Sequence, residues 1–205
     1  MFDAKLRPLI DPPLNAVGRI LANNGVTANI LTFAGLVLGL GGAVAIANAE
    51  FGWALVLILA NRVFDGLDGA VARVRGPTPL GGYFDIVADF AFYVSIPLAF
   101  GLQDAEQTLP ALVLVASFVL TGVSFLAFAA VAAEHGKSTQ AHGRKSFFYS
   151  TGLAEGGETI VVFVAMCALP ANFPMIAYLY AGLCAATVVQ RSALAIVVFR
   201  DRPDL

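Results

Sequence analysis

Long apolar stretches alternate with short polar connections along almost the whole chain. Each stretch is close to the roughly 20 residues that an α-helix needs to cross a bilayer. Because backbone polar groups in lipid must find partners within their own segment, these stretches are predicted to be helices. The predicted spans cover residues 28–48, 52–73, 83–101, 108–133, 147–169 and 174–199. The pattern therefore predicts an all-α integral membrane protein with six transmembrane helices.

The first 25 residues differ from the rest, because they are polar and contain three prolines. A short part of this segment nevertheless shows helical spacing of apolar side chains, with Arg19 on another face. These apolar side chains are Leu14, Val17, Ile20 and Leu21. The pattern predicts a short N-terminal helix that lies in the membrane interface, with a disordered tail as the alternative.

Composition agrees with a membrane protein. The chain is 59% hydrophobic and 13% charged, and its mean hydropathy is +0.81. A soluble domain of this length would not carry so much apolar surface. No repeat or long linker divides the sequence, so we expect one membrane domain over 1–205, with an interfacial segment at 1–25 and a six-helix bundle at 28–199.

Lysine and arginine occur at alternate ends of the predicted spans. They precede the first span, follow the second, lie between the fourth and fifth, and follow the sixth. The connections at 48–51, 101–108 and 170–174 contain none. By the positive-inside rule, both termini and the aspartate-rich end of the bundle are expected in the cytoplasm. We therefore expect a multi-pass protein of the inner (cytoplasmic) membrane.

Four aspartates occur within 25 residues, around the connection between the second and third predicted spans. Asp65 and Asp68 are three apart and Asp85 and Asp89 are four apart, so each pair shares one helix face. The glycine- and proline-rich turn at 76–82 should bring the two faces together. Converging carboxylates repel one another, and divalent cations such as Mg2+, Mn2+ or Ca2+ remove that penalty. The sequence therefore predicts a metal site at the cytoplasmic end of the bundle.

The aspartates are too numerous to be accounted for by ion pairing alone. Pairing with Arg62, one turn before Asp65, would neutralise one buried carboxylate but not four. Gly66 and Gly69 leave room for a ligand or a neighbouring helix, and Arg73 can offer a planar fork of donors to phosphate oxygens. Metals, phosphate and arginine in one partly dehydrated site indicate phosphoryl-type transfer.

The pattern D-x2-D-G-x2-A-R-x7-G-x3-D-x3-D is complete from Asp65 to Asp89. It resembles the defining motif of the CDP-alcohol phosphotransferases. The resemblance implies that Asp65, Asp68, Asp85 and Asp89 form a site for two ions, Mg2+ or Mn2+, with Asp89 as the general base. It also implies transfer of a phosphoalcohol group from CDP-diacylglycerol or another CDP-alcohol to an acceptor hydroxyl, with release of CMP, by a homodimer in contact with membrane lipid. No nucleic acid partner is expected.

The same resemblance suggests which residues bind the CDP group. Gly69 would let the diphosphate approach, and Arg73 would contact it. Asn29 and Thr32, at the start of the first span, are candidates for cytidine or phosphate contacts, although Ala28 replaces the proline that family members often have. The alternative for Asn29 and Thr32 is a polar helix cap. The expected CDP-binding residues are Asn29, Thr32, Gly66, Gly69, Arg73 and Gly81.

The acceptor site is less sharply marked. Basic residues in similar enzymes hold an acceptor phosphate, which makes Arg144, Lys145 and Arg191 candidates. Glu155 and Glu158, one turn apart, could bind a polyol or an amine acceptor, or could pair with a basic side chain. Phosphatidylglycerophosphate synthesis is the specific expectation, and a polyol, amino-alcohol or lipid acceptor is the alternative. Two rival classes remain, namely an aspartate-rich membrane prenyltransferase and an ion transporter.

Overall fold

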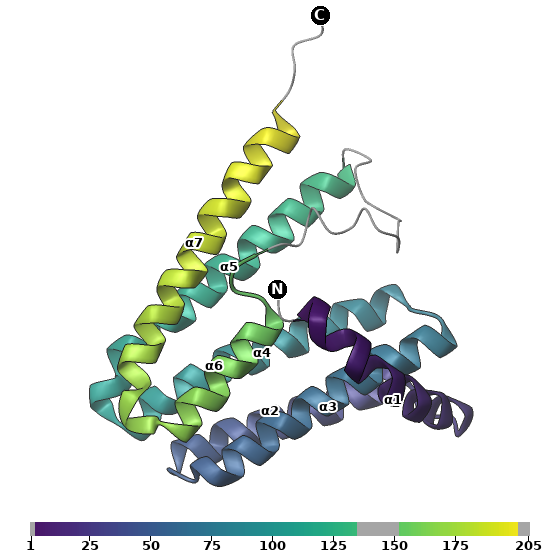
Figure 1. Cartoon of the computed structure of the whole chain (residues 1–205), viewed down its shortest axis with the longest axis horizontal. Helices are drawn as coiled ribbons and strands as arrows, with labels where there is room; N and C mark the ends of the chain where they lie inside the picture. The colour runs from purple at the N-terminus through teal and green to yellow at the C-terminus, as the bar shows by residue number, and fades with distance from the viewer. Residues whose placement is uncertain (1–2, 135–151, 201–205) are drawn as a thin grey trace, which may run out of the picture.

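The computed structural model describes residues 3–134 and 152–200, and the regular structure in them is helical (Figure 1). The predicted all-α class is confirmed for these residues. The helices are α1 (Asp3–Asn23), α2 (Ala28–Ala47), α3 (Phe51–Arg75), α4 (Pro79–Gln103), α5 (Thr108–Glu134), α6 (Gly156–Ala168) and α7 (Phe173–Phe199), with short 3-10 turns at η1 (Ala105–Gln107) and η3 (Pro170–Asn172).

Helices α2 to α7 correspond to the predicted spans, but they do not all resemble simple transmembrane segments. By length and composition, four helical segments could cross a membrane: Ala28–Ala47, Pro79–Gln103, Ala105–Glu134 and Pro170–Phe199. Helix α3 has 25 residues but carries charged side chains along its second half, and α6 has only 13 residues. Large apolar side chains such as Leu102 and Val197 point outward and are exposed, as expected of surfaces that contact lipid.

The fifth span was predicted too long. The prediction began at residue 147, whereas the described helix α6 begins at Gly156 and the residues from Gly152 to Glu155 are not helical. Polar contacts satisfy the backbone in this non-helical turn. The amide of Gly152 donates to Glu155 Oε1 at 2.9 Å, and the amide of Ala154 donates to Thr187 Oγ1 at 2.9 Å. Residues 147–151 lie outside the described part of the chain.

The N-terminal helix was predicted over residues 14–21 and is present, but it is longer. It ends where Gly25 adopts a φ of +87°, a conformation that glycine tolerates and that commonly stops helices. One face of α1 packs against α3, since Leu14 and Leu21 contact the buried cluster that includes Leu67. Val17 and Ile20 on the helix are exposed, so an apolar face remains for lipid, as an interfacial helix requires.

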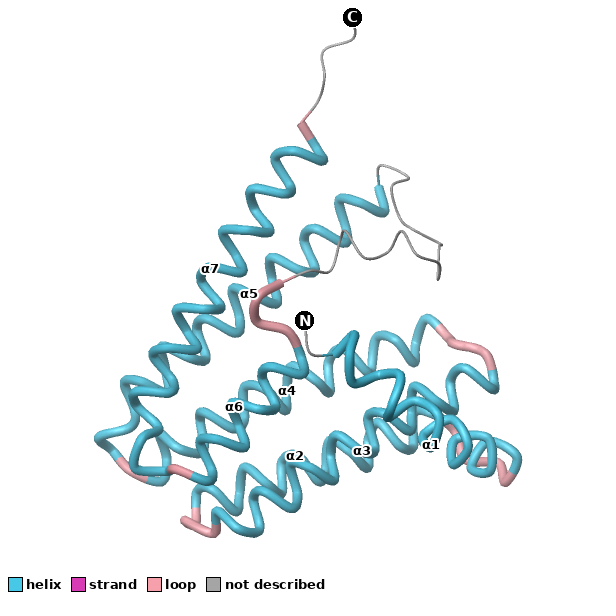
Figure 2. Tube along the Cα trace, in the orientation of Figure 1, coloured by secondary structure: helices cyan, strands magenta, loops and turns pink. Residues whose placement is uncertain are grey.

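The other helices pack around a core rich in phenylalanine. Helix α2 lies against α3 and α4, whereas α5 runs beside α7 and also contacts α4 (Figures 1 and 2). The rings of Phe100 and Phe173 stack with centroids 4.3 Å apart. Small residues allow the helices to approach one another closely. On α2, for example, a Cβ on Gly39 would lie only 2.5 Å from Cδ2 of Phe92 on α4. This packing fixes α2, α3 and α4 against one another, and these three helices carry the site described next.

Candidate functional site

The hairpin between α3 and α4 brings the aspartates together, as predicted. Helix α3 ends at Arg75, and Gly76 follows it with a φ of +92°. Thr78 caps α4 by accepting a hydrogen bond from the amide of Gly81 at 3.0 Å. All four aspartates line one pocket with side chains of α2. The pocket is lined by Thr32, Gly35, Leu36, Asn61, Arg62, Asp65, Asp68, Asp85, Ala88 and Asp89.

Three of the aspartates form a group that could hold a metal ion. Asp65, Asp68 and Asp85 each offer a carboxylate oxygen, and these oxygens lie within 4.8 Å of one another. Asp68 is only 6% exposed. Carboxylates at this separation repel one another strongly when partly shielded from water. Oxygen donors of this kind are the ligands that Mg2+ and Mn2+ prefer, so the donor set fits a divalent cation.

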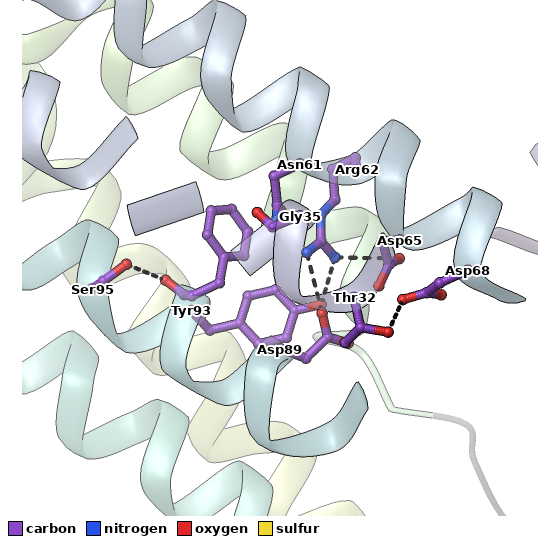
Figure 3. A network of polar contacts seen from close by, with 10 residues as sticks. Thr32, Gly35, Asn61, Arg62, Asp65, Asp68, Asp89, Tyr93 and Ser95 are labelled. Atoms are coloured by element: carbon purple, nitrogen blue, oxygen red, sulfur yellow. Dashed lines mark hydrogen bonds and ion pairs between the residues drawn. The ribbon is translucent and has the colours of Figure 1, made fainter. Parts of the chain in front are cut away.

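Asp89 lines the same pocket but has a different immediate partner. Its Oδ1 is 3.1 Å from Nη2 of Arg62, and Nη1 of Arg62 is 3.6 Å from Oδ2 of Asp65 (Figure 3). The guanidinium of Arg62 therefore joins a carboxylate of α3 to one of α4. From the sequence, Arg62 is expected to be a counter-ion for one aspartate, whereas in the structure it contacts two. Its spacing of three residues from Asp65 was the available signal that it shares this helix face.

Thr32 is in the pocket, where it holds an aspartate in place. Its hydroxyl lies 2.6 Å from Oδ2 of Asp68 and 3.1 Å from the carbonyl oxygen of Ala28, and it can donate to either. The cap of α2 is supplied by Thr27, which accepts from the amide of Ile30 at 3.4 Å. Thr32 is thus a support for the carboxylate group, rather than a helix cap.

Asn29 and Gly81 lie next to each other, where α2 and α4 begin. A Cβ on Gly81 would be 3.2 Å from Oδ1 of Asn29 and 2.9 Å from the Thr78 hydroxyl. The absence of a side chain at Gly81 is therefore needed for this close approach. The fold thus brings together two positions that were predicted from separate parts of the sequence, although neither is among the residues that line the aspartate pocket.

Gly66 and Gly69 of α3 have different surroundings. A Cβ on Gly66 would lie 2.7 Å from Cδ1 of Leu14, so the helix that approaches Gly66 is α1. A Cβ on Gly69 would meet only Nη1 of Arg73, at 3.5 Å, among the described atoms within 4 Å. Of the two, Gly69 is the one with space beside it for a ligand.

Arg73 is held by a residue that sequence reasoning missed. Its Nε and Nη2 donate to Oδ1 of Asn15 on α1, at 3.2 and 2.8 Å. Two nitrogens of the guanidinium are thus oriented by α1, while Nη1 is the nitrogen next to Gly69. No local sequence signal marks Asn15, because the contact joins residues 58 positions apart.

The predicted acceptor residues are only partly brought toward the aspartates. Arg191 is buried, and its Nη1 donates to the carbonyl of Thr121 at 2.9 Å and to Ser124 Oγ at 2.7 Å. It is not among the residues that line the aspartate pocket. Arg144 and Lys145 lie outside the described residues.

The start of α6 lies close to the pocket. Glu155 precedes α6 and Glu158 is in its first turn. A Cβ on Gly156 would be 3.2 Å from the hydroxyl of Tyr93, and this hydroxyl is 3.5 Å from Nη1 of Arg62. Tyr93 therefore lies between the first residue of α6 and the residues around Asp89.

Known proteins resemble this chain over most of its length. Residues 25–199 match the family described as CDP-alcohol phosphatidyltransferase. Over 195 residues the chain is 44% identical to the Inner membrane protein YnjF of Escherichia coli, and the alignment covers 93% of each protein. Over 92 residues it is 34% identical to Archaetidylinositol phosphate synthase of Pyrococcus horikoshii, covering 42% of this chain and 46% of that protein.

Solved structures share the fold. The crystal structure of Mycobacterium tuberculosis phosphatidylinositol phosphate synthase (PgsA1) with CDP-DAG bound superposes with a TM-score of 0.68 at 19% identity, covering 94% of this chain and 98% of that one. The same enzyme in complex with manganese and citrate also gives a TM-score of 0.68 at 19% identity, covering 93% of each chain. At this identity the likeness concerns the fold.

Proposed function

Since the chain belongs to the CDP-alcohol phosphatidyltransferase family, we propose that it transfers a phosphatidyl group from CDP-diacylglycerol to an acceptor hydroxyl and releases CMP. Membership of this family decides the enzyme class in favour of a phosphotransferase, over a membrane prenyltransferase or an ion transporter. The observation that carries the proposal is the group of three carboxylates within 4.8 Å, in one pocket with Asp89. The CDP-DAG bound to the M. tuberculosis enzyme of the same fold supports this choice of donor.

The proposed metal site comprises Asp65, Asp68, Asp85 and Asp89, and it would hold two ions, Mg2+ or Mn2+. The complex of the M. tuberculosis enzyme with manganese supports a divalent cation here. Such ions, when bound, neutralise the diphosphate and stabilise the leaving phosphate. Thr32 keeps the carboxylate of Asp68 in its orientation through the hydrogen bond of 2.6 Å.

In the proposed reaction, Asp89 accepts the proton of the acceptor hydroxyl. The hydroxyl oxygen forms a bond to the phosphorus that carries diacylglycerol, and the bond from that phosphorus to the bridging oxygen breaks. CMP leaves with the electron pair of the broken bond, and the proton remains on Asp89 until it passes to water. The open space at Gly69 would admit the diphosphate, and Nη1 of Arg73 can donate to it there. Asn29 and Gly81 would contact the cytidine or a phosphate.

We propose a phosphorylated polyol as the acceptor class, because two of the three similar proteins are named as an archaetidylinositol phosphate synthase and a phosphatidylinositol phosphate synthase. Glycerol 3-phosphate, which the expected phosphatidylglycerophosphate synthesis would use, belongs to this class but is not the alcohol in either name. Glu155 and Glu158 at the start of α6 would contact the hydroxyl groups of the acceptor. Its phosphate would be contacted by Arg144, Lys145 and Arg191.

The inner membrane is the proposed location, as for the E. coli relative. Both termini would lie in the cytoplasm, and two copies would form a homodimer.

CMP release by the purified protein tests the proposal. CDP-diacylglycerol in mixed micelles, with Mg2+ or Mn2+, would be offered with inositol phosphate, glycerol 3-phosphate, inositol, serine, ethanolamine and phosphatidylglycerol in turn. We expect metal-dependent CMP release with one phosphorylated polyol. Folded protein that releases no CMP with any acceptor would contradict the proposed donor and reaction. Release with serine or ethanolamine would contradict only the acceptor class.

Replacing Asn15 with alanine is expected to raise the KM for CDP-diacylglycerol by roughly fivefold, with kcat little changed. The reason is that Arg73 would lose the partner that orients its Nε and Nη2. Steady-state kinetics with varied CDP-diacylglycerol would measure the change. Asn24→Ala is the matched control, because Asn24 directly follows α1 and, among the described residues, its side chain donates only to the Ile20 carbonyl, at 2.8 Å. An equal rise in KM for both variants would contradict a specific role of Asn15.

A further inference from the structure

Arg62 is the cation among the residues that line the aspartate pocket, and its role is unassigned by the family motif, which begins at Asp65. Its side chain is 17% exposed and lies between α3 and α4. Nη2 is 3.1 Å from Oδ1 of Asp89, and Nη1 is 3.6 Å from Oδ2 of Asp65. The guanidinium therefore contacts one carboxylate inside the three-aspartate group and the one carboxylate of the four that lies outside it.

Further contacts fix the guanidinium in place. Its Nε donates to Oδ1 of Asn61 at 2.7 Å, and its central carbon lies 4.7 Å from the ring centroid of buried Phe92. Asn61 is 3% exposed and donates from Nδ2 to the carbonyl of Gly35 at 2.8 Å. Figure 3 shows Arg62 beside Asn61, with its guanidinium directed toward Asp65 and Asp89. Arg62 is thus anchored to α2 through Asn61 and to α4 through an aromatic face and a carboxylate.

We propose that Arg62 is a positioning residue that holds Asp89 for proton transfer and supplies a permanent positive charge to the carboxylate group. This inference rests on the proposed function, in which Asp89 accepts the proton. With Oδ1 of Asp89 engaged by Arg62, Oδ2 is the oxygen that receives the proton of the acceptor hydroxyl. A planar guanidinium can serve two carboxylates at once, which the ammonium group of lysine cannot do in the same geometry.

Loss of the Arg62 guanidinium should affect cation binding and turnover in opposite directions. Arg62 and a divalent cation both neutralise Asp65, so they compete for its negative charge. Removing the guanidinium should therefore tighten cation binding and at the same time slow turnover. A side chain needed only for folding would, when lost, weaken both properties.

The experiment compares Arg62→Gln and Arg62→Lys with the full-length wild-type protein. Binding of Mn2+ alone is followed by the EPR signal of unbound Mn2+, and CMP release gives kcat and KM. For Arg62→Gln we expect roughly tenfold tighter Mn2+ binding, because one nearby positive charge is lost. We also expect kcat to fall about 100-fold, which is within the loss of rate expected when a general base is misplaced. For Arg62→Lys we expect Mn2+ affinity near that of the wild type and a reduced kcat.

Arg75→Gln is the matched control, since it removes the same charge from the same helix. Nη1 of Arg75 donates to the backbone carbonyls of Gly25 and Val26, at 3.1 and 3.0 Å, away from the carboxylates. We expect wild-type Mn2+ affinity and kcat in this variant.

Weaker Mn2+ binding in Arg62→Gln, or an unchanged kcat in either Arg62 variant, would overturn the proposal. If Arg62→Gln does not fold, the test uses Arg62→Lys alone. A lower kcat with unchanged Mn2+ affinity in that variant supports the proposal, and an unchanged kcat overturns it. A wild-type protein that releases no CMP would defeat the proposed function instead. The Mn2+ measurement would then still test whether the charge of Arg62 opposes cation binding. Tighter Mn2+ binding in Arg62→Gln would support this role, and any other result would contradict it.

Discussion

Replacing Asp89 with asparagine is expected to reduce kcat for CMP release by about a thousandfold, because an amide cannot accept the proton of the acceptor hydroxyl. The substitution preserves the shape of the side chain, and its carbonyl oxygen can still accept a hydrogen bond from Arg62, whose Nη2 lies 3.1 Å from Oδ1 in the wild type. We therefore expect the variant to fold. Steady-state kinetics with the best acceptor, together with the thermal unfolding temperature, would measure both effects.

Asp104→Asn is the matched control for Asp89→Asn. It makes the same change directly after the same helix, where Asp104 accepts a hydrogen bond from the amide of Glu106 at 2.9 Å. We expect its kcat to remain within about twofold of the wild type, as for most surface substitutions. If Asp89→Asn retained most of its kcat and only raised a KM, Asp89 would be a binding residue and not the base.

Replacing Asp68 with asparagine is the second change with a large expected effect. The 6% exposed carboxylate belongs to the group of three whose oxygens lie within 4.8 Å, and asparagine removes its negative charge while it keeps an oxygen for the hydroxyl of Thr32. We expect Mn2+ affinity to fall by at least tenfold, by the loss of one anionic ligand. We expect CMP release to fall about a thousandfold at a fixed, subsaturating Mn2+ concentration.

Two companion measurements separate the charge of Asp68 from its support by Thr32. Thr32→Val removes the hydrogen bond but no charge, and we expect a loss of only about fivefold in Mn2+ affinity. Chelation of the wild type with EDTA should abolish CMP release, and added Mg2+ or Mn2+ should restore it. Full activity in EDTA, or wild-type Mn2+ affinity in Asp68→Asn, would contradict the metal site.

The two aspartate variants are expected to differ in their metal binding. Asp68 belongs to the three-carboxylate group, whereas Asp89 pairs with Arg62. Asp68→Asn should therefore impair Mn2+ binding more strongly than Asp89→Asn, although both lose turnover. Equal losses of Mn2+ affinity would indicate that all four carboxylates contribute alike.

Local signals in the sequence were sufficient for the helices and the motif. Apolar runs long enough to cross a bilayer predict helices because lipid offers no partner for the backbone. Spacings of three and four residues place Asp65 with Asp68 and Asp85 with Asp89, whatever surrounds them. The boundary of the fifth span could not be predicted in the same way. The turn before α6 depends on Thr187, whose hydroxyl accepts a hydrogen bond from the amide of Ala154, 33 positions away.

By itself the sequence determined the all-helical membrane class, the aspartate hairpin and the family motif, because each depends on periodicity or on spacing within a short segment. Only the tertiary structure decided which side chains meet across helices. Asp68 is held by Thr32 from 36 positions away, Arg73 by Asn15 from 58, and Arg191 by Thr121 from 70. Such contacts depend on how whole helices pack, and packing is a property of shape complementarity between distant segments that no local pattern records.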